Sequence, residues 1–417
     1  MQLKRVVVTG IGAITPLGNN LNDYWNGLIN GVSGADMITN FDAGKFRTKF
    51  ACEVKGFDPV AFLDRKEARK IDRFTQFALY ASDQAMSDAG LNKENINPDR
   101  VGVVFASGIG GLITFQQEVV EFAKGDGTPR FNPFFIPKMI LDIAAGQISM
   151  RHNLRGPNFA VVSACASSTN AIIEAYNLLR LGKADIILSG GSEAVISEAG
   201  VGGFNAMKAM SERNDDPKTA SRPYDKDRDG FVMGEASGVV VMETLEHALA
   251  RGAKIYCEIK GGGSTADAHH ITAPHPEGLG ARNVMIAALE DANMQPEEID
   301  YINTHGTSTP MGDTAEVKAI THVFGEHAYK LNISATKSMT GHCLGAAGVI
   351  EAIACIQAVV HDIVPPTINH FTDDPDIDPK LNFTFNKAEK RIVNAALSNT
   401  FGFGGHNACV IVKKFVA

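Results

Sequence analysis

The stretch AVVSACASSTNAIIEAYNLLRLG, residues 160–182, decides the fold of this chain. It opens with an apolar run typical of a strand, turns through small residues around Cys165, and continues with helical periodicity up to Gly182. A thiol at such a strand-to-helix junction faces the positive end of the helix dipole, which favours thiolate over thiol. Because most lone cysteines are simply buried small hydrophobes, the role of Cys165 depends on what the rest of the chain brings to this turn.

The second half of the chain repeats this order of elements. LNISATK at 331–337 is typical of a strand, SMTGH at 338–342 of a turn, and GAAGVIEAIACIQAVV at 345–360 of a helix. That helix has small residues in its first turns and little polar surface, so we expect it to be deeply buried against another backbone. This repeated strand–turn–helix order predicts two similar halves, 1–255 and 256–417, whose two helix N-termini lie close together.

Further apolar runs predict additional strands that are buried on both faces. They are RVVVTGI (5–11), VGVVFASG (101–108), FAVVSA (159–164), ADIILSGG (184–191) and SGVVVMETL (237–245). Helical segments alternate with them, among them FTQFALYASDQAMSDAG (74–90), which ends at a glycine. This alternation predicts an α/β fold with a mostly parallel sheet that helices cover on both faces.

Composition and charge exclude several classes of protein. Of the 417 residues, 44% are hydrophobic and 21% are charged, as in ordinary soluble proteins. The net charge of -8 argues against nucleic-acid binding. Six cysteines without a CxxC pair predict neither a zinc site nor a disulfide framework, and they fit a cytoplasmic protein. We expect no membrane span, and we interpret the apolar N-terminus as a first core strand rather than a signal peptide.

Two histidine turns change the interpretation of Cys165. NTHGTSTPMGD at 303–313 places His305 just after an apolar strand, and ATKSMTGHCLGAAG at 335–348 places Lys337 and His342 in the turn before the apolar helix. Neither histidine has a partner at metal-ligand spacing. Taken singly, each is as compatible with a structural role as with a catalytic one. Two histidines and a lysine in strand-end turns, with a cysteine in the equivalent turn, together predict one active site.

The motifs around these residues match those of one protein family. These motifs occur with VVVTGIGAITPLG (6–18), RPYDKDRDGFVMGEASG (222–238) and SNTFGFGGHNACVIV (398–412), in an order that covers essentially the whole chain. The chain resembles the β-ketoacyl-[acyl-carrier-protein] synthases, condensing enzymes of the thiolase-like group, and among them the bacterial synthases that elongate medium and long acyl chains. The resemblance implies a duplicated, five-layered αβαβα fold with two mixed sheets around buried helices.

The resemblance also implies a reaction and roles for residues. Cys165 would take an acyl chain from a carrier-protein thioester, with the backbone N–H groups of Cys165 and Phe403 as the oxyanion hole. His305 and His342, as neutral imidazoles, would donate hydrogen bonds to the malonyl thioester while CO2 leaves. Lys337 would act electrostatically by lowering the pKa of both histidines. The product would be a 3-oxoacyl carrier protein, so the chain would be an acyltransferase of fatty acid elongation.

Substrate and partner residues follow from the same resemblance. Phe403, between glycines, would be a gate over the acyl pocket, with TADAHHITAP (265–274) as a mobile loop beside it. Thr307 and Thr309 would bind the pantetheine arm of the carrier. The other residues that would contact substrate are Ile109, His270 and Phe401, and the acidic partner of Lys337 would be Glu316.

A basic segment and a second copy of the chain complete the expected partners. The residues that would dock an acidic acyl carrier protein are Lys66, Arg69 and Lys70, which share a helical face, and Arg130. We expect a homodimer whose interface lines part of the acyl pocket. We expect no cofactor beyond the phosphopantetheine of the carrier, and no metal, because His269, His270 and His275 are irregularly spaced.

Rival interpretations fit less well. The glycines of residues 6–18 lack the full dinucleotide-binding pattern, and SATK (334–337) lacks the companion motifs of penicillin-binding enzymes. A coenzyme A-dependent thiolase would need a second catalytic cysteine in a glycine-rich motif, which the surroundings of Cys409 do not supply. A ketosynthase of a type II polyketide pathway has nearly the same motifs and stays open. The chain departs from the family pattern at His406 and Ala236, where threonine and glycine are usual.

Overall fold

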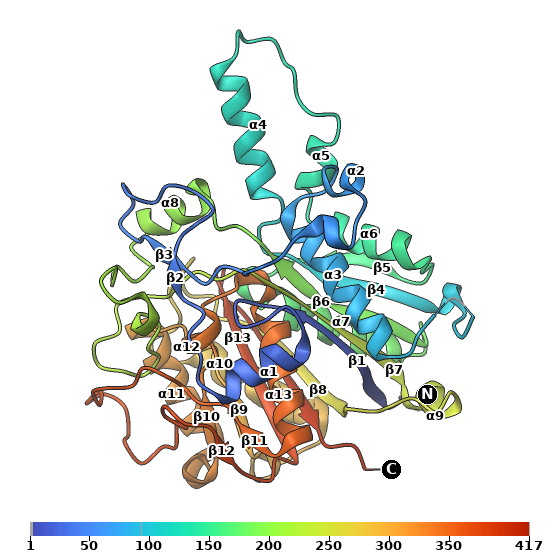
Figure 1. The fold of residues 1–417 in the computed structure, drawn as a ribbon. Helices are drawn as coiled ribbons and strands as arrows, with labels where there is room; N and C mark the ends of the chain where they lie inside the picture. Colours follow the sequence, from blue (N-terminus) through green and yellow to red (C-terminus); the bar gives the residue numbers. More distant parts are fainter. Residues whose placement is uncertain (1–2, 93, 417) are drawn as a thin grey trace.

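The computed structural model describes residues 3–92 and 94–416, and its centre is one ten-stranded sheet (Figure 1). The strands lie in the order β10 (Asn332–Ser334), β9 (Tyr301–Asn303), β13 (Ala395–Gly402), β14 (His406–Lys413), β8 (Cys257–Ala266), β1 (Val6–Ile14), β7 (Ala236–Thr244), β6 (Ile186–Glu193), β4 (Val101–Ala106) and β5 (Asn158–Val161).

Each half of the chain contributes five neighbouring strands to this sheet. The two sets meet where Val6–Val8 of β1 pair antiparallel with Cys257–Ile259 of β8. The two expected sheets are therefore joined into one through a short three-residue pairing. The boundary that we placed at residue 255 stays a prediction.

Strand direction differs from the mostly parallel sheet that the apolar runs predicted. The outer pairs β10–β9, β9–β13, β6–β4 and β4–β5 are parallel, whereas all pairs from β13 to β6 through the centre are antiparallel. The prediction of a mostly parallel sheet was wrong, and the mixed sheet that the family resemblance implied is confirmed. An apolar run reports that helices cover both faces of a strand, and it says nothing of the direction of its neighbours.

Five layers result from the way helices cover the sheet. Between the two halves lie α7 (Ser167–Arg180) and α13 (Ala347–His361), which contact each other and strands of both halves. On the outer face of the N-terminal half, α3 (Arg73–Asp88) covers β1 and β7 and packs on α6 (Ile143–His152). On the C-terminal half, α10 (Leu279–Ala292) covers β8 and β14 and packs on α11 (Pro310–Phe324). The thiolase-like α/β fold is confirmed.

The apolar helix of the second half is a core helix. Every residue of α13 from Ala347 to Val359 is buried. A Cβ atom on Gly348 would lie 2.0 Å from the Thr169 hydroxyl oxygen of α7, so glycine is what lets the two central helices approach so closely. We expected no stretch of this kind, but the segment Leu344–His361 is long and apolar enough to cross a membrane by length and composition. In the structure 89% of it is buried inside the fold.

The remaining elements surround this core. The other helices are α1 (Leu21–Ile29), α2 (Arg65–Ala68), α4 (Leu112–Lys124), α5 (Phe135–Met139), α8 (Glu198–Ala206), α9 (Leu245–Ala250) and α12 (Lys337–Thr340). The 3-10 turns are η1 (Pro59–Ala61), η2 (Pro98–Arg100), η3 (Ala164–Ala166), η4 (Pro217–Thr219), η5 (Pro296–Glu298), η6 (Gly325–Lys330) and η7 (Leu344–Ala346), and the short strands are β2 (Asp36–Met37), β3 (Phe50–Ala51), β11 (Ile363–Val364) and β12 (Glu389–Lys390).

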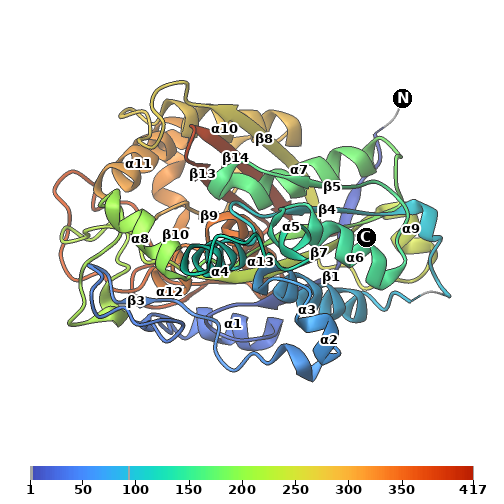
Figure 2. The same cartoon turned by 90° about the horizontal axis from the view of Figure 1, so that it is seen from above.

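Two features of the N-terminal half face outward. In Figure 1, α4 and the chain between α4 and α5 rise away from the body of the molecule, and Figure 2 views α4 nearly along its axis. Strand β5 lies at the edge of the sheet, and its Phe159 is 39% exposed. The prediction that the run FAVVSA is a fully buried strand was therefore wrong, because β4 is the one neighbour of β5 among the described strands.

Candidate active site

Cys165 and His342 belong to two turns of the same construction. Cys165 lies in η3, which leads into α7, and His342 lies just before η7, which leads into α13. Each 3-10 turn begins with a non-glycine residue of positive φ, Ala164 at 52° and Leu344 at 48°. The two turns contact each other, which confirms that the helix N-termini of the two halves meet. Such strained residues persist where the surrounding structure holds them, as at active sites.

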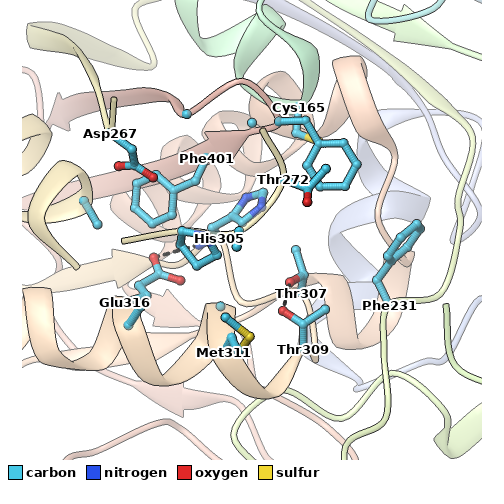
Figure 3. Close-up of a pocket in the computed structure, with 18 of the residues that line it drawn as sticks. Cys165, Phe231, Asp267, Thr272, His305, Thr307, Thr309, Met311, Glu316 and Phe401 are labelled. Atoms are coloured by element: carbon cyan, nitrogen blue, oxygen red, sulfur yellow. Dashed lines mark hydrogen bonds between the residues drawn. The ribbon is translucent and has the colours of Figure 1, made fainter. Parts of the chain in front are cut away.

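A pocket of about 250 Å³ opens at this meeting point (Figure 3). Of the residues predicted from the sequence, those that line it are Cys165, His305, His342, Thr307, Thr309, Glu316, Phe401 and Phe403. Residues that the sequence did not single out also line it, among them Phe231, whose ring meets the His342 ring edge-on at 5.5 Å. One cavity thus gathers the cysteine turn, both histidine turns and the glycine-rich loop.

The reactive groups are close to one another. His342 Nε2 lies 3.1 Å from Cys165 Sγ. The rings of His305 and His342 are perpendicular, with centroids 5.3 Å apart. The ring centroids of His305 and Phe401 are 5.5 Å apart. The backbone N–H of Phe403 interacts with the Cys165 thiol, which places this loop against the nucleophile.

Burial decides the protonation of these groups. It lowers the pKa of both His305 and His342 well below the ordinary value, and the positive charge of Lys337 lowers the pKa of each further. Both imidazoles are therefore neutral at pH 7. Burial also raises the pKa of the Cys165 thiol to about 12, against opposing effects of Lys337 and of the Phe403 N–H. Burial thus opposes the thiolate that the helix dipole favours, and the dipole's effect on Cys165 stays a prediction.

Lys337 has a different partner from the one that the resemblance suggested. Its ammonium group pairs with the carboxylate of Glu351 in α13, and both side chains are only 1% exposed. Burial raises the pKa of Glu351 to about 7, while Lys337 opposes the rise. The assignment of Glu316 as the partner of Lys337 was wrong. The available signal was Glu351 itself, a lone acidic residue in an otherwise apolar helix.

Glu316 instead holds the backbone of the His305 turn. Its two carboxylate oxygens accept hydrogen bonds from the N–H groups of His305 and Gly306, both at 2.9 Å. The side-chain amide of Asn399 donates to the same carboxylate at 3.2 Å. Burial raises the pKa of Glu316 to about 7, against these hydrogen bonds. Glu316 therefore holds the backbone that carries His305, and Figure 3 shows its carboxylate beside that turn.

The predicted substrate residues divide into two groups. Thr307 and Thr309 line the pocket with their hydroxyl oxygens 3.0 Å apart. Ile109 packs in the apolar cluster that contains Cys165 and is not part of the pocket lining. His270 is exposed, and its Nδ1 accepts hydrogen bonds from the N–H groups of Thr272 and Ala273, which line the pocket in its place.

The two loops beside the pocket are joined by backbone hydrogen bonds. The N–H of Gly404 donates to Ile271 O at 2.7 Å, and the N–H of Asp267 donates to Gly405 O at 2.9 Å. The glycine-rich loop of Phe403 and the loop after β8 are thus coupled, so displacement of one requires movement of the other. Among the described residues, no group of three histidine, cysteine or acidic side chains is placed to hold a metal ion.

The predicted docking residues lie on the surface, but not on one helix. Helix α2 ends at Ala68, so Lys66 is helical while Arg69 and Lys70 follow the last turn. Lys70 pairs with Glu67 at 2.6 Å and lies over the ring of Phe134 at 5.7 Å, which brings this segment to the base of α5. Arg130 pairs with Asp126 at 3.4 Å. The prediction that Lys66, Arg69 and Lys70 share one helical face was wrong, and their role in docking a carrier protein stays a prediction.

The fold and this site define a thiolase-like condensing enzyme, in which a cysteine turn and a histidine turn from two similar halves face one pocket. Residues 3–248 match the family model of the β-ketoacyl synthase N-terminal domain, and residues 256–371 match that of the β-ketoacyl synthase C-terminal domain. The chain belongs to the β-ketoacyl synthase family.

Individual relatives and structures agree with this assignment. The chain is 50% identical to the 3-oxoacyl-[acyl-carrier-protein] synthase 2 of Synechocystis sp. over 100% of this chain and 99% of that protein. Its structure is similar to a β-ketoacyl synthase from Burkholderia phymatum, with a TM-score of 0.92, 35% identity, and 99% and 100% of the two chains covered. It is also similar, with a TM-score of 0.91, 32% identity and 100% of both chains covered, to a ketosynthase in complex with the acyl-carrier protein of a type II polyketide synthase.

Proposed function

We propose that this chain catalyses the decarboxylative condensation of acyl-[acyl-carrier protein] with malonyl-[acyl-carrier protein] in fatty acid elongation. The products are 3-oxoacyl-[acyl-carrier protein], CO2 and free carrier protein. The observation that carries the proposal is the position of Cys165 Sγ, 3.1 Å from a neutral His342 and beside a second neutral imidazole, in a pocket with an open mouth. The full-length similarity to a 3-oxoacyl-[acyl-carrier-protein] synthase supports the substrate class.

The first half-reaction transfers the acyl chain to Cys165. The thiol sulfur attacks the acyl thioester carbonyl, a C–S bond forms, and the bond to the pantetheine sulfur breaks. The thiol proton passes to the departing pantetheine sulfur, so the carrier protein leaves with a free thiol. The N–H groups of Cys165 and Phe403 stabilise the oxyanion that forms between these events.

The second half-reaction makes the new carbon–carbon bond. When CO2 leaves the malonyl group, the electron pair of the broken bond moves toward the thioester oxygen as an enolate. Neutral His305 and His342 stabilise that charge as hydrogen-bond donors. Burial keeps them neutral, and the charge of Lys337, which pairs with Glu351, adds to that effect. The enolate carbon attacks the acyl–Cys165 thioester, and Cys165 leaves as a thiolate that is reprotonated. The reaction uses no cofactor beyond the carrier's pantetheine arm.

The alternative of a type II polyketide ketosynthase is less well supported. The sequence identity to a ketosynthase of such a system is 32%, whereas the identity to a 3-oxoacyl-[acyl-carrier-protein] synthase 2 is 50%. The structural neighbour bound to its carrier supports acyl carrier protein as the partner of this chain as well. We place the reaction in the cytoplasm, where the six free, buried cysteines stay reduced.

The proposal includes a homodimer. Aromatic side chains of the α4–α5 region are stacked and remain 40% or more exposed, as at Phe122 and Phe131, whose centroids are 5.3 Å apart. Beside the open edge of β5, Val162 is 55% exposed. A second copy is the occupant that such an edge suits best, because two identical edge strands pair antiparallel across a twofold axis. We expect Phe159→Asp with Val162→Asp to give monomers in light scattering, whereas Ile392→Asp, at another exposed position, leaves the dimer intact.

The direct test of the activity is product analysis. Purified protein is incubated with dodecanoyl- and malonyl-carrier protein, and carrier-bound products are identified by mass spectrometry. We expect 3-oxotetradecanoyl-carrier protein from the native chain and from Cys409→Ala, and none from Cys165→Ala. Product formation by Cys165→Ala, or acylation of the native chain from coenzyme A esters only, contradicts the proposal.

A further inference from the structure

Glu193 is a buried carboxylate that the proposed reaction does not use. It is the last residue of β6, and its side chain has no exposed surface. Three groups donate hydrogen bonds to its Oε1, namely the Ser107 hydroxyl at 2.9 Å, the Ile109 N–H at 3.1 Å and the Gly110 N–H at 3.2 Å. One carboxylate oxygen therefore holds the segment Ser107–Gly110, which follows β4.

The other oxygen of Glu193 connects the two halves of the chain. Its Oε2 accepts from the Gly108 N–H at 2.8 Å and from the Gly345 N–H at 3.0 Å. Gly345 belongs to η7, directly after the His342 turn. The backbones are so close that a Cβ atom on Gly345 would lie 2.2 Å from the Gly108 nitrogen, and one on Gly108 would lie 2.8 Å from Glu193 Oε2. Glycine at both positions is what allows the five hydrogen bonds to form.

The segment that Glu193 holds carries Ile109 to the apolar cluster that includes the nucleophile. This cluster contains Cys165 of one turn and Leu344 of the other, and Ile109 packs against it. The charge of Glu193 also raises the pKa of the Cys165 thiol, which places the carboxylate within electrostatic range of the reacting sulfur. Glu193 is thus linked to the apolar wall behind Cys165 and not only to the stability of the sheet.

We propose that Glu193 is a positioning residue that sets which acyl chain lengths the enzyme accepts, by holding Ile109 against the apolar cluster that contains Cys165. The inference rests on the proposed function, since it concerns the acyl chain that Cys165 takes up. A carboxylate suits the task because it only accepts hydrogen bonds and can satisfy all five donors. In Glu193→Gln, an NH2 group replaces one of the two carboxylate oxygens and faces the donors that this oxygen accepted from. At least two of the five hydrogen bonds are then lost, and the segment Ser107–Gly110 is held less tightly.

The test measures acylation of Cys165 by butyryl-, dodecanoyl- and hexadecanoyl-carrier protein, followed by intact-protein mass spectrometry. In Glu193→Gln the ratio between the fastest and slowest chain falls about tenfold, because a loosened Ile109 discriminates less. Release of CO2 from malonyl-carrier protein changes less than about threefold. The matched control is Glu243→Gln, a buried carboxylate on β7 beside the other end of β6, which keeps the native ratio.

Two outcomes overturn the inference. One is an unchanged chain-length ratio in folded Glu193→Gln, and the other is an equal loss for every chain length and for CO2 release, which is what a merely structural role gives. If Glu193→Gln does not fold, Ser107→Ala removes one of the five donors and must lower the ratio about twofold, and an unchanged ratio there also overturns the inference. Failure of the proposed function has a different signature, because the native chain itself then takes no acyl group from any carrier.

Discussion

The two turns that meet at the pocket share a backbone and differ in what surrounds them. Both are 3-10 turns that begin with a positive φ and lead into a central helix. Behind the cysteine turn, α7 is partly polar, whereas α13 behind the histidine turn is buried and holds Glu351 against Lys337. Duplication thus supplies the geometry of the site, and side chains found in one half only supply its electrostatics.

The largest expected effect comes from breaking the buried pair that only the second half has. Lys337→Met leaves Glu351 without its partner, and we expect the free energy of unfolding to fall by about 3–5 kcal/mol. The double variant Lys337→Met with Glu351→Gln removes both charges and regains most of that loss. Urea denaturation of the single and double variants measures this, and equal stability of the two would contradict the importance of the pairing.

The same double variant has a pH signature. In the native chain, burial holds the pKa of His305 and His342 well below the ordinary value and the positive charge of Lys337 lowers it further, so both stay neutral as the pH falls through about 6.5. Without that charge their pKa values rise. As the pH is lowered, the double variant should therefore lose condensation activity at a higher pH than the native chain does. If the acid side of the pH–rate profile does not move, burial alone keeps His305 and His342 neutral.

The next effect separates the two half-reactions. His305→Ala removes one donor to the enolate oxygen, so we expect CO2 release from malonyl-carrier protein to fall about 10²–10³-fold. Acylation of Cys165 should change less than about threefold, because His342 and not His305 lies at the sulfur. Radiolabelled CO2 release and intact mass report the two steps separately, and an equal loss in both would refute this division.

A smaller effect tests how closely the two central helices pack. Gly348→Ala places a methyl group 2.0 Å from the Thr169 hydroxyl, and we expect a loss of about 1–3 kcal/mol in the free energy of unfolding. Gly203→Ala in α8 is the matched control, since nothing lies within 4 Å of its added Cβ and alanine favours the helix. Thermal denaturation should therefore order the proteins as Gly203→Ala, native chain and Gly348→Ala, from most to least stable.

The smallest effect concerns the binding of acyl carrier protein, the partner that we propose for this chain. If the basic segment docks it, Lys66→Glu raises the KM for acyl- and malonyl-carrier protein by the same few-fold factor, and salt reduces the difference. The kcat values should stay unchanged. A change in only one of the two KM values would mean that the two substrates dock differently.

Sequence alone predicted the parts of this molecule that repeat or that stand out chemically. The strand–turn–helix echo predicted the meeting of the two turns, and the motifs predicted that Cys165, His305 and His342 share a site. The prediction of a mostly parallel sheet was wrong, because an apolar run indicates that a strand is buried but not which strands lie beside it or in which direction they run. The edge position of β5 was missed for the same reason.

Side-chain partners were the least predictable part of the site. Glu316 is near His305 in sequence and was assigned to Lys337, yet it accepts hydrogen bonds from the His305 backbone. Glu351 lies fourteen positions after Lys337, and only the packing of α13 brings the two together. Glu193 gave no signal in the sequence, because its five donors come from two distant segments that the fold brings together.

The most direct test of the account is CO2 release from malonyl-carrier protein by Cys165→Ala. If the cysteine turn performs acyl transfer and the histidine turn performs decarboxylation, this variant takes no acyl group but still releases CO2, at a rate within about tenfold of the native chain. Loss of CO2 release together with loss of acylation, in a variant that folds normally, would contradict the division of labour between the two turns.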